Sequence, residues 1–344
     1  MERALLEVLA ANADSLRVLR VRTLRVPQLV LGSDTDSALA LIGAAPRLER
    51  LDADVACYAE DAPRLMRGEA PWGPLRIHGL DIRVHQRNDV VPPAVAAVLA
   101  DANLQPTLSS VRLRSADIRE PRVFDALVDG LLARRVLHLV LSGCTPPAAA
   151  PLARLLAGGA LTALESTYMK AEVPLFDTAG AALVADALRL NTTLTTLEFA
   201  QTGICIDMTA ACTLLGALVG HPSLNELVLW NEHPRDQGRA ALCAALAALV
   251  AADAPALQCI EIMDIELKDD GMAPIVNALR CNRHLRDLDV TGTDMSEDFT
   301  RDQLLPAIRA NTGLQAFRCE PFFDTDPSMI DEAMDLVADR AQRR

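Results

Sequence analysis

The chain repeats itself at a short period, and this repetition limits its possible folds more than any other feature. Three segments, 187–194, 278–285 and 307–314, share the pattern Ala-(Leu/Ile)-Arg-x-Asn-x-x-Leu, and a looser copy at 217–224 contains His221. A unit this small cannot bury an apolar core alone, so neighbouring copies must stack on one another. The repeat therefore predicts a stacked array, which also suits a chain of 344 residues in which only 3% are aromatic.

Each copy is followed by an LxxLxL pattern or its equivalent, and working outward from the clear copies gives eleven such segments. Alternation of this kind predicts a short strand that buries its Leu side. The ten steps from Leu19 to Phe317 average about 30 residues. The weaker versions are Trp72/Leu75/Ile77 and Leu108/Val111/Leu113. The uneven steps around Leu75 and Val111 predict an irregular N-terminal third.

A helix is predicted between successive strands. Its clearest apolar stripe has helical spacing and consists of Met272, Ile275, Val276 and Leu279. The Asn residues at 191, 282 and 311 come where such stripes end, and we interpret them as left-handed caps. One strand and one helix per repeat predict an α/β solenoid that is curved and right-handed, with parallel strands on its concave face and helices on its convex face.

These motifs resemble the ribonuclease-inhibitor-like leucine-rich repeats over essentially the whole chain. The rhythm is similar to the bacterial effector-type (GALA-like) version, because Gly180-Ala181-Ala182-Leu183 runs into Ala187-Leu188 and then Asn191-Thr192-Thr193-Leu194. One departure from this family concerns the consensus Asn or Cys that stands three residues after LxxLxL. Most repeats of this chain lack it, and Cys144 is the clear exception. The resemblance implies a solenoid over 1–326, irregular around 55–115.

The segment 327–344 is predicted to be a C-terminal capping helix, since terminal repeats of solenoids usually need a cap. Its apolar stripe would comprise Ile330, Ala333, Met334 and Val337. Arg340 falls in its last turn, where a cation suits the helix dipole.

Composition excludes several classes of function. The net charge of −13 argues against nucleic acid as a partner, and the acidic excess lies in the second half of the chain. The eight Cys residues form no CxxC pair and none has zinc-site spacing, so we expect reduced thiols, no metal and no cofactor.

The start resembles part of a repeat helix rather than a secretory signal, and no apolar run is long enough to span a membrane. We therefore expect a cytoplasmic protein, or one delivered into a host cell by a route that needs no signal peptide.

The fragment with the most catalytic character is Cys205-Ile206-Asp207, which resembles the nucleophile motif of a bacterial ubiquitin-ligase family. In that family the motif lies on a separate helical domain that this chain lacks. We expect Cys205 to pack in a loop after a strand, and we expect no catalytic residue and no enzyme.

The strand face carries the candidate binding residues. If the Leu side chains point inward, the residues between them point to the concave surface. Trp230 follows a strand there as a possible anchor in a charged surround, which is common at interfaces. The predicted partner-binding residues are Trp230, Glu198, Glu226, Glu261, Met263, Asp287 and Asp289. The acids among them would form one ladder. A secondary basic face would comprise Arg20, Arg22, Arg76, Arg112 and Arg114. The alternative is that the charges only solubilise the face and that Trp230 folds back onto its loop.

The sequence thus favours a monomeric protein-binding scaffold whose protein partner has a basic surface. The resemblance points to a translocated effector, and an endogenous scaffold stays open. A GTPase regulator is the second hypothesis, because a GTPase-activating family uses similar repeats with an acidic end.

Overall fold

A computed structural model describes residues 18–25, 50–58, 79–83, 109–115, 118–145, 147–167, 173–230, 232, 238–319 and 327–342; for the first three ranges and for 327–330 it describes the backbone alone. The chain forms two compact units, 1–151 and 152–344. Eleven strands lie in the described residues, as the repeat predicts.

The N-terminal unit contains parallel strands that pair in chain order. The strands are β1 (Val18–Arg25), β2 (Arg50–Tyr58), β3 (Gly79–Arg83), β4 (Ser110–Arg114) and β5 (His138–Ser142), and α5 (Pro121–Arg134) lies between the last two. Leu19 pairs with Leu51 and Val111 with Leu139, so the predicted alternation sets the register of these strands.

The predicted position of the third strand was wrong. It was placed at Leu75 and Ile77, whereas β3 begins at Gly79 and aligns Leu80 with Val111. Both Leu75-x-Ile77 and Leu80-x-Ile82 alternate, and alternation alone cannot choose between them. With Leu80 in the ladder, the step to β4 matches the later repeats. Trp72, Leu75, Arg76 and Ile77 lie outside the described residues.

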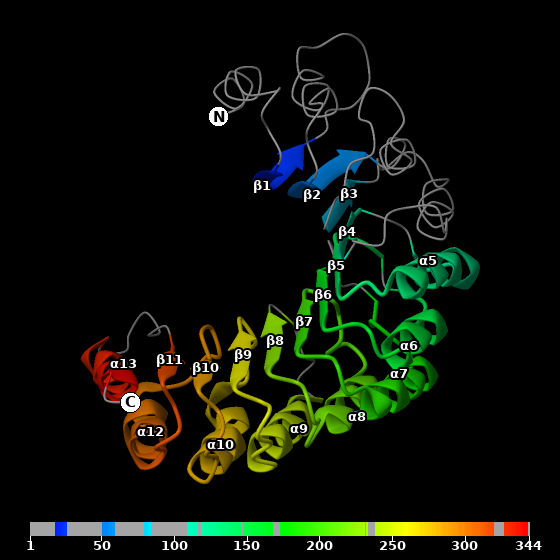
Figure 1. Ribbon diagram of the computed structural model, residues 1–344. Coiled ribbons are helices and arrows are strands. Elements are labelled where there is room, and N and C mark those ends of the chain that lie inside the picture. Colours follow the sequence, from blue (N-terminus) through cyan, green and yellow to red (C-terminus); the bar gives the residue numbers. More distant parts are fainter. Residues whose placement is uncertain are drawn as a thin grey trace. The chain divides into compact units, whose positions relative to one another are not determined.

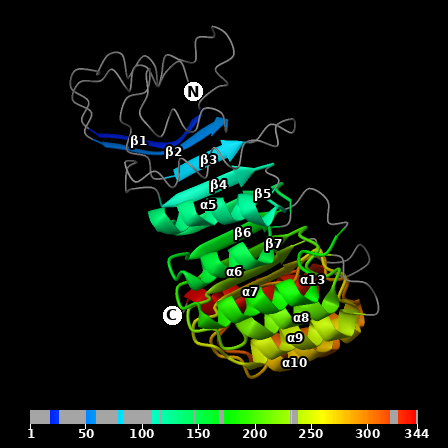
Figure 2. The same cartoon turned by 90° about the vertical axis from the view of Figure 1, so that its right-hand side faces the viewer.

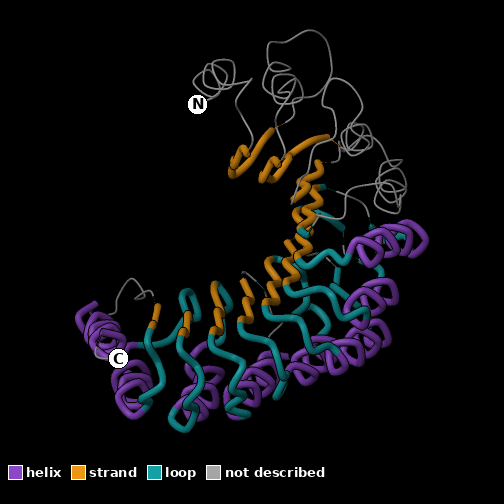
Figure 3. The backbone as a smooth tube through the Cα atoms, in the orientation of Figure 1, coloured by secondary structure: helices purple, strands orange, loops and turns teal. Residues whose placement is uncertain are grey.

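The C-terminal unit alternates parallel strands with helices. Its strands are β6 (Ala163–Thr167), β7 (Thr196–Ala200), β8 (Glu226–Trp230), β9 (Cys259–Met263), β10 (Asp287–Asp289) and β11 (Ala316–Arg318). Its helices are α7 (Thr178–Leu190), α8 (Met208–Leu218), α9 (Arg239–Ala251), α10 (Lys268–Leu279), α11 (Glu297–Phe299), α12 (Leu305–Ala310) and α13 (Pro327–Gln342), with a π-helical turn at Thr300–Leu304; α6 (Ala149–Ala157) contains the boundary between the units. Within this unit the strands lie on one side and the helices on the other (Figures 1 and 3).

Small aliphatic side chains explain why these layers stack. Helices α7 to α10 pack side by side (Figure 2), and their inner faces consist largely of Ala, Val, Leu and Ile. The predicted stripe of α10 is buried at all four positions, and the inward residues of the strands, such as Leu197 and Leu288, are 1% exposed. Strand and helix layers of this kind, repeated in chain order, make the fold a leucine-rich-repeat solenoid.

The Asn residues that end the helices do not adopt the predicted left-handed conformation. Asn191 has φ −74° and ψ 134°, which is extended backbone. Its buried side chain instead joins two repeats, because Nδ2 donates to the Leu156 carbonyl at 2.6 Å and Oδ1 accepts from the Leu194 N–H at 2.7 Å. Asn282 and Asn311 make the same kind of bridge. Asn is therefore selected here for a donor and an acceptor on one short side chain.

Helix α13 covers the end of the C-terminal unit through two apolar side chains. Ala333 and Val337 are buried as predicted, whereas Met334 is 38% exposed and does not belong to the buried stripe. Arg340 donates to the carbonyls of Ile308 at 2.8 Å and Asn311 at 2.5 Å. Because the last carbonyls of a helix lack partners within it, Arg340 caps α12 as well as suiting its own helix dipole.

Candidate functional site

The strand face of the C-terminal unit presents two rows of side chains that we define by strand register. The central row contains Glu165, Glu198, Val228, Glu261, Asp289 and Arg318, and the first row contains Ala163, Thr196, Glu226, Cys259, Asp287 and Ala316. The predicted single acidic ladder was therefore wrong. The acids alternate between rows because Glu226 and Asp287 open their strands, whereas Glu198, Glu261 and Asp289 are each the third residue of theirs.

Arg318 neutralises the acids at the C-terminal end of this face. Its guanidinium donates to Asp289 Oδ2 at 2.6 Å and to Glu261 Oε1 at 2.8 Å, and it lies 3.3 Å from Asp287. The hydrogen bond to Asp289, and then the charges of Asp287, Asp289 and Glu261, raise the pKa of Arg318 above its ordinary value. Asp289 was predicted to face solvent but is only 5% exposed. The face thus supplies its own cation where the prediction required one from a partner.

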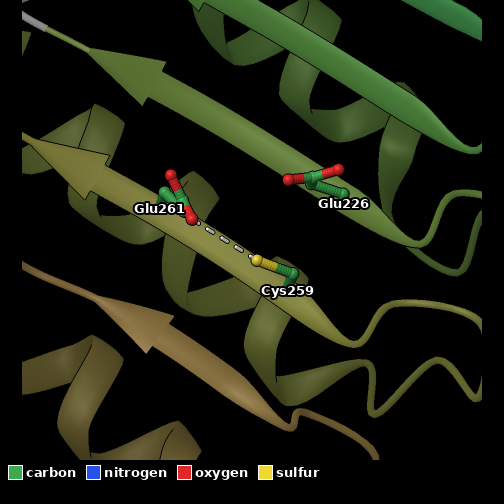
Figure 4. A group of neighbouring side chains, drawn as sticks. All are labelled: Glu226, Cys259 and Glu261. Atoms are coloured by element: carbon green, nitrogen blue, oxygen red, sulfur yellow. Dashed lines mark hydrogen bonds between the residues drawn. The ribbon is translucent and has the colours of Figure 1, made fainter. Parts of the chain in front are cut away.

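Three potential metal ligands meet beside this cluster (Figure 4). Single atoms of Glu226, Cys259 and Glu261 all lie within 4.8 Å of one another, and the Cys259 Sγ lies 3.9 Å from Glu261 Oε1. Burial, followed by the nearby carboxylates, raises the pKa of Cys259 to about 12, and burial raises the pKa of Glu261. Arg318 already forms an ion pair with Glu261, so the contacts around these three side chains favour the ion pair over a metal.

Trp230 stands at the end of β8, beside the acidic rows. Its side chain is 39% exposed, as the anchor hypothesis requires, and it pairs in register with Met263, which is half-buried rather than exposed. The indole Nε1–H donates to Asp264 Oδ2 at 2.8 Å. The sequence did not single out Asp264, because this bond joins residues in successive repeats. Trp230 is consequently both accessible and fixed in orientation.

The basic residues predicted as a secondary face belong to the N-terminal unit. Arg112 and Arg114 are half-buried residues of β4, and Arg112 aligns with Asp81 on one side and Val140 on the other. The backbones of Arg20 and Arg22 lie in β1, but their side chains are outside the described residues. The structure thus places Arg20 and Arg22 on β1 and Arg112 and Arg114 on β4, and the basic face as a whole stays a prediction because Arg76 lies outside the described residues.

Cys205 lies in a turn after β7 and is 1% exposed, as the non-catalytic interpretation expects. Burial, and then the charge of Glu232, raises the pKa of its thiol well above the ordinary value, which opposes formation of a nucleophilic thiolate. Asp207, the other residue of the motif, caps α8 by accepting from the Thr209 and Ala210 amides.

Glu232 is a buried acid that the sequence analysis missed. It occupies the consensus Asn position of its repeat, three residues after Leu229, and Thr202 occupies that position one repeat earlier. The Glu232 carboxylate accepts from the Thr202 hydroxyl at 2.7 Å and from the Gly203 N–H at 2.9 Å. Polar residues other than Asn thus bridge neighbouring repeats here. The repeat spacing predicts a bridging residue at position 232, but the consensus at this position is Asn or Cys, and Glu232 does not match it.

Comparisons with known proteins add little to this geometry. No family model and no curated protein matches the chain. A solved structure titled as a complex of TLR13 with ssRNA13 is 11% identical, with a TM-score of 0.39, and the alignment covers 88% of this chain and 51% of the other. The YdjI aldolase of Escherichia coli K12 is 9% identical, with a TM-score of 0.19, over 73% of this chain and 85% of the other. This chain thus spans about half of the TLR13 chain.

Both TM-scores are low, so the class of protein is defined by the repeat geometry itself. The chain has the fold of a leucine-rich-repeat solenoid, and its C-terminal unit presents an acidic strand face with Trp230 at the carboxyl end of β8. Among the helices that the structure describes, none combines the length and apolar composition that crossing a lipid bilayer requires.

Proposed function

We propose that this chain is a monomeric protein-recognition scaffold that acts by binding rather than by catalysis. Its partner would meet the strand face of the C-terminal unit through a basic surface. The observation that carries the proposal is Trp230, which is 39% exposed and held by Asp264 beside the two acidic rows. Aromatic side chains that are already ordered make effective anchors, because little conformational entropy is lost when they bind.

The acidic rows support a basic partner although Arg318 neutralises part of them. Arg318 contacts Glu261, Asp287 and Asp289. Within the described part of the chain, the carboxylate of Glu226 instead accepts a 3.3 Å hydrogen bond from the Thr196 hydroxyl. A complementary charge on the partner would speed association and select against acidic proteins.

A role as a translocated bacterial effector is the finer form of this proposal. It is supported by the rhythm of 180–194, which resembles effector-type repeats. An endogenous scaffold would use the same face. Delivery of a tagged chain into host cells by the secretion machinery of the source organism would separate the two.

A GTPase regulator is the alternative from another class. The acidic end of the repeat array supports it, but no Arg in the described residues stands out as an arginine finger. Turnover of GTP by a panel of small GTPases, with and without the chain, distinguishes the alternatives. Acceleration of one GTPase would favour the regulator, and binding without acceleration would favour the scaffold.

A photo-crosslinking experiment tests the proposed face. A photoreactive amino acid would replace Met263 on the strand face or, as the control, Ala244, which is exposed on α9 on the helical side. The proposal predicts that crosslinking in a host-cell lysate yields a discrete protein adduct from position 263 and none from position 244. The same adducts from both positions, or an adduct only from position 244, would contradict it.

A further inference from the structure

We infer that Trp230, Met263 and Asp264 form a subsite for one arginine side chain of the partner. This inference rests on the proposed function, because it names the group that would occupy one part of the binding face. The three residues lie together at the carboxyl ends of β8 and β9, where Trp230 pairs with Met263 and bonds to Asp264.

The indole is held from both sides through the backbone. The Trp230 carbonyl accepts from the Gln201 N–H at 2.9 Å, which ties it to the preceding repeat. The Asp264 N–H donates to the Thr291 carbonyl at 2.8 Å, which ties the carboxylate to the following repeat. Trp230 therefore belongs to a hydrogen-bonded structure that joins four successive repeats, those of β7 to β10, rather than to a free loop end.

Gly292 is the residue that lets Asp264 take this position. It has φ +70°, a conformation that favours glycine, and a Cβ added there would overlap Asp264 Oδ1 and lie 2.9 Å from its Cα. Asp264 itself has φ +54°. Any side chain at 292 would thus push away the carboxylate that orients the indole, so Gly292 is a positioning residue for Trp230.

The chemistry of the subsite fits a guanidinium group. Asp264 occupies the N–H edge of the indole, while the π face of an indole attracts cations. The carboxylate at the ring edge adds a full negative charge, and the thioether of Met263 supplies an apolar neighbour in the next strand. A planar guanidinium can stack on an aromatic ring and bond to a carboxylate with the same group, which a lysine ammonium cannot do.

The same surface already binds one arginine, its own. The Arg318 guanidinium lies against three carboxylates of β9 and β10, and its side chain remains 44% exposed. Trp230 lies on β8, on the other side of β9 from Arg318. No Arg or Lys in the described residues contacts Trp230 through a hydrogen bond or ion pair. The partner's arginine would therefore take a second cation position on the strand face.

The test uses a tetra-arginine peptide as the probe, with tetra-lysine and tetra-citrulline peptides for comparison. Titration is followed by the indole N–H resonance of Trp230, assigned by its loss in Trp230→Phe. We expect the arginine peptide to shift this resonance and to bind at least about threefold more tightly than either comparison peptide. Citrulline has the shape of arginine without its charge. Equal binding of the citrulline or the lysine peptide would overturn the arginine assignment.

Variants separate positioning from simple loss of fold. Asp264→Ala and Gly292→Ala should each weaken arginine-peptide binding about three- to tenfold. Asp264→Asn can still accept the indole hydrogen bond, so the peptide should still shift the indole resonance of this variant, and the variant should lose less affinity. Glu297→Gln, which removes a charge from the exposed first turn of α11, should leave affinity within about twofold. If Asp264→Ala and Gly292→Ala bind like the wild type, the inference is wrong. If the peptide fails while a crosslinked partner still depends on Trp230, only this inference fails and the proposed function stands.

Discussion

The imidazole of His221 takes the place that Asn191 occupies one repeat earlier, and it bridges to the Leu188 carbonyl with an Nε2–O distance of 3.1 Å. A carbonyl only accepts, so Nε2 carries the proton and donates. Nδ1 then accepts from the Leu224 N–H at 3.1 Å. Both bonds require the neutral ring, because a protonated Nδ1 would face an N–H donor.

This arrangement predicts acid sensitivity at one joint between repeats. Burial lowers the pKa of His221 below its ordinary value of 6.5. A lowered pKa in the folded state means that its contribution to the unfolding free energy is complete above about pH 6.5 and is lost as the pH falls below that value. His221→Asn introduces the residue that makes this bridge at 191, 282 and 311. Urea unfolding should give similar stabilities for both proteins at about pH 7.5 and a more stable variant at about pH 5.5. A parallel decline of both proteins with falling pH would show that His221 is not the sensitive group.

Removal of an Asn bridge should destabilise the C-terminal unit. Asn282 is buried and donates to the Val250 carbonyl at 2.7 Å while accepting from the Leu285 N–H at 2.8 Å. Asn282→Ala removes both hydrogen bonds and the acceptor of the Leu285 N–H, whereas the Val250 carbonyl still accepts from the Asp253 N–H. The substitution should cost about 1–3 kcal/mol of unfolding free energy. The matched control is Asn277→Ala on the exposed face of α10, expected to stay within about 0.5 kcal/mol. Equal effects of the two substitutions in denaturant unfolding would refute the bridging role.

Apart from those of β3, the strand residues could be predicted from the sequence because alternation and repeat spacing both restrict them. The bridges between repeats could not. From the sequence, Asn191 could be predicted only to end a helix, because the carbonyl to which its side chain donates, that of Leu156, lies 35 residues earlier. The sequence predicted which acidic residues lie on the strand face, but the division of these residues into two rows depends on where each strand begins. The bond from Trp230 to Asp264 joins residues 34 apart and leaves no local pattern.

Strand Leu residues should matter far more than helix Leu residues on the outer face. Leu197 is 1% exposed and Leu183, on α7, is 52% exposed. Leu197→Ala should cost about 2–5 kcal/mol, because a thin layer between two neighbours cannot easily close the resulting cavity. Leu183→Ala should change stability by no more than about 0.5 kcal/mol. Thermal and urea unfolding measure both, and a small effect at 197 would argue against tight layer packing.

Arg318 should stabilise the acidic end of the face. Asp289 is 5% exposed, so Arg318→Gln leaves a nearly buried carboxylate without its cation. We expect a loss of about 1–3 kcal/mol, which is less than for a fully buried pair because the Arg318 side chain is 44% exposed. In a double-mutant cycle, Asp289→Asn should reduce the effect of Arg318→Gln. Additive effects of the two substitutions would show that the pair is not coupled.

The most direct test of the proposed function is the affinity of the crosslinked partner, once purified, for Trp230→Ala. We predict a loss of at least about 2 kcal/mol of binding free energy with an unchanged circular dichroism spectrum, because the partner would bury Trp230 as an anchor. Leu190→Ala is the matched control, since it removes a 76% exposed apolar side chain from the helical side and should leave affinity unchanged. Wild-type affinity in folded Trp230→Ala would contradict the proposal that the partner binds the strand face of the C-terminal unit.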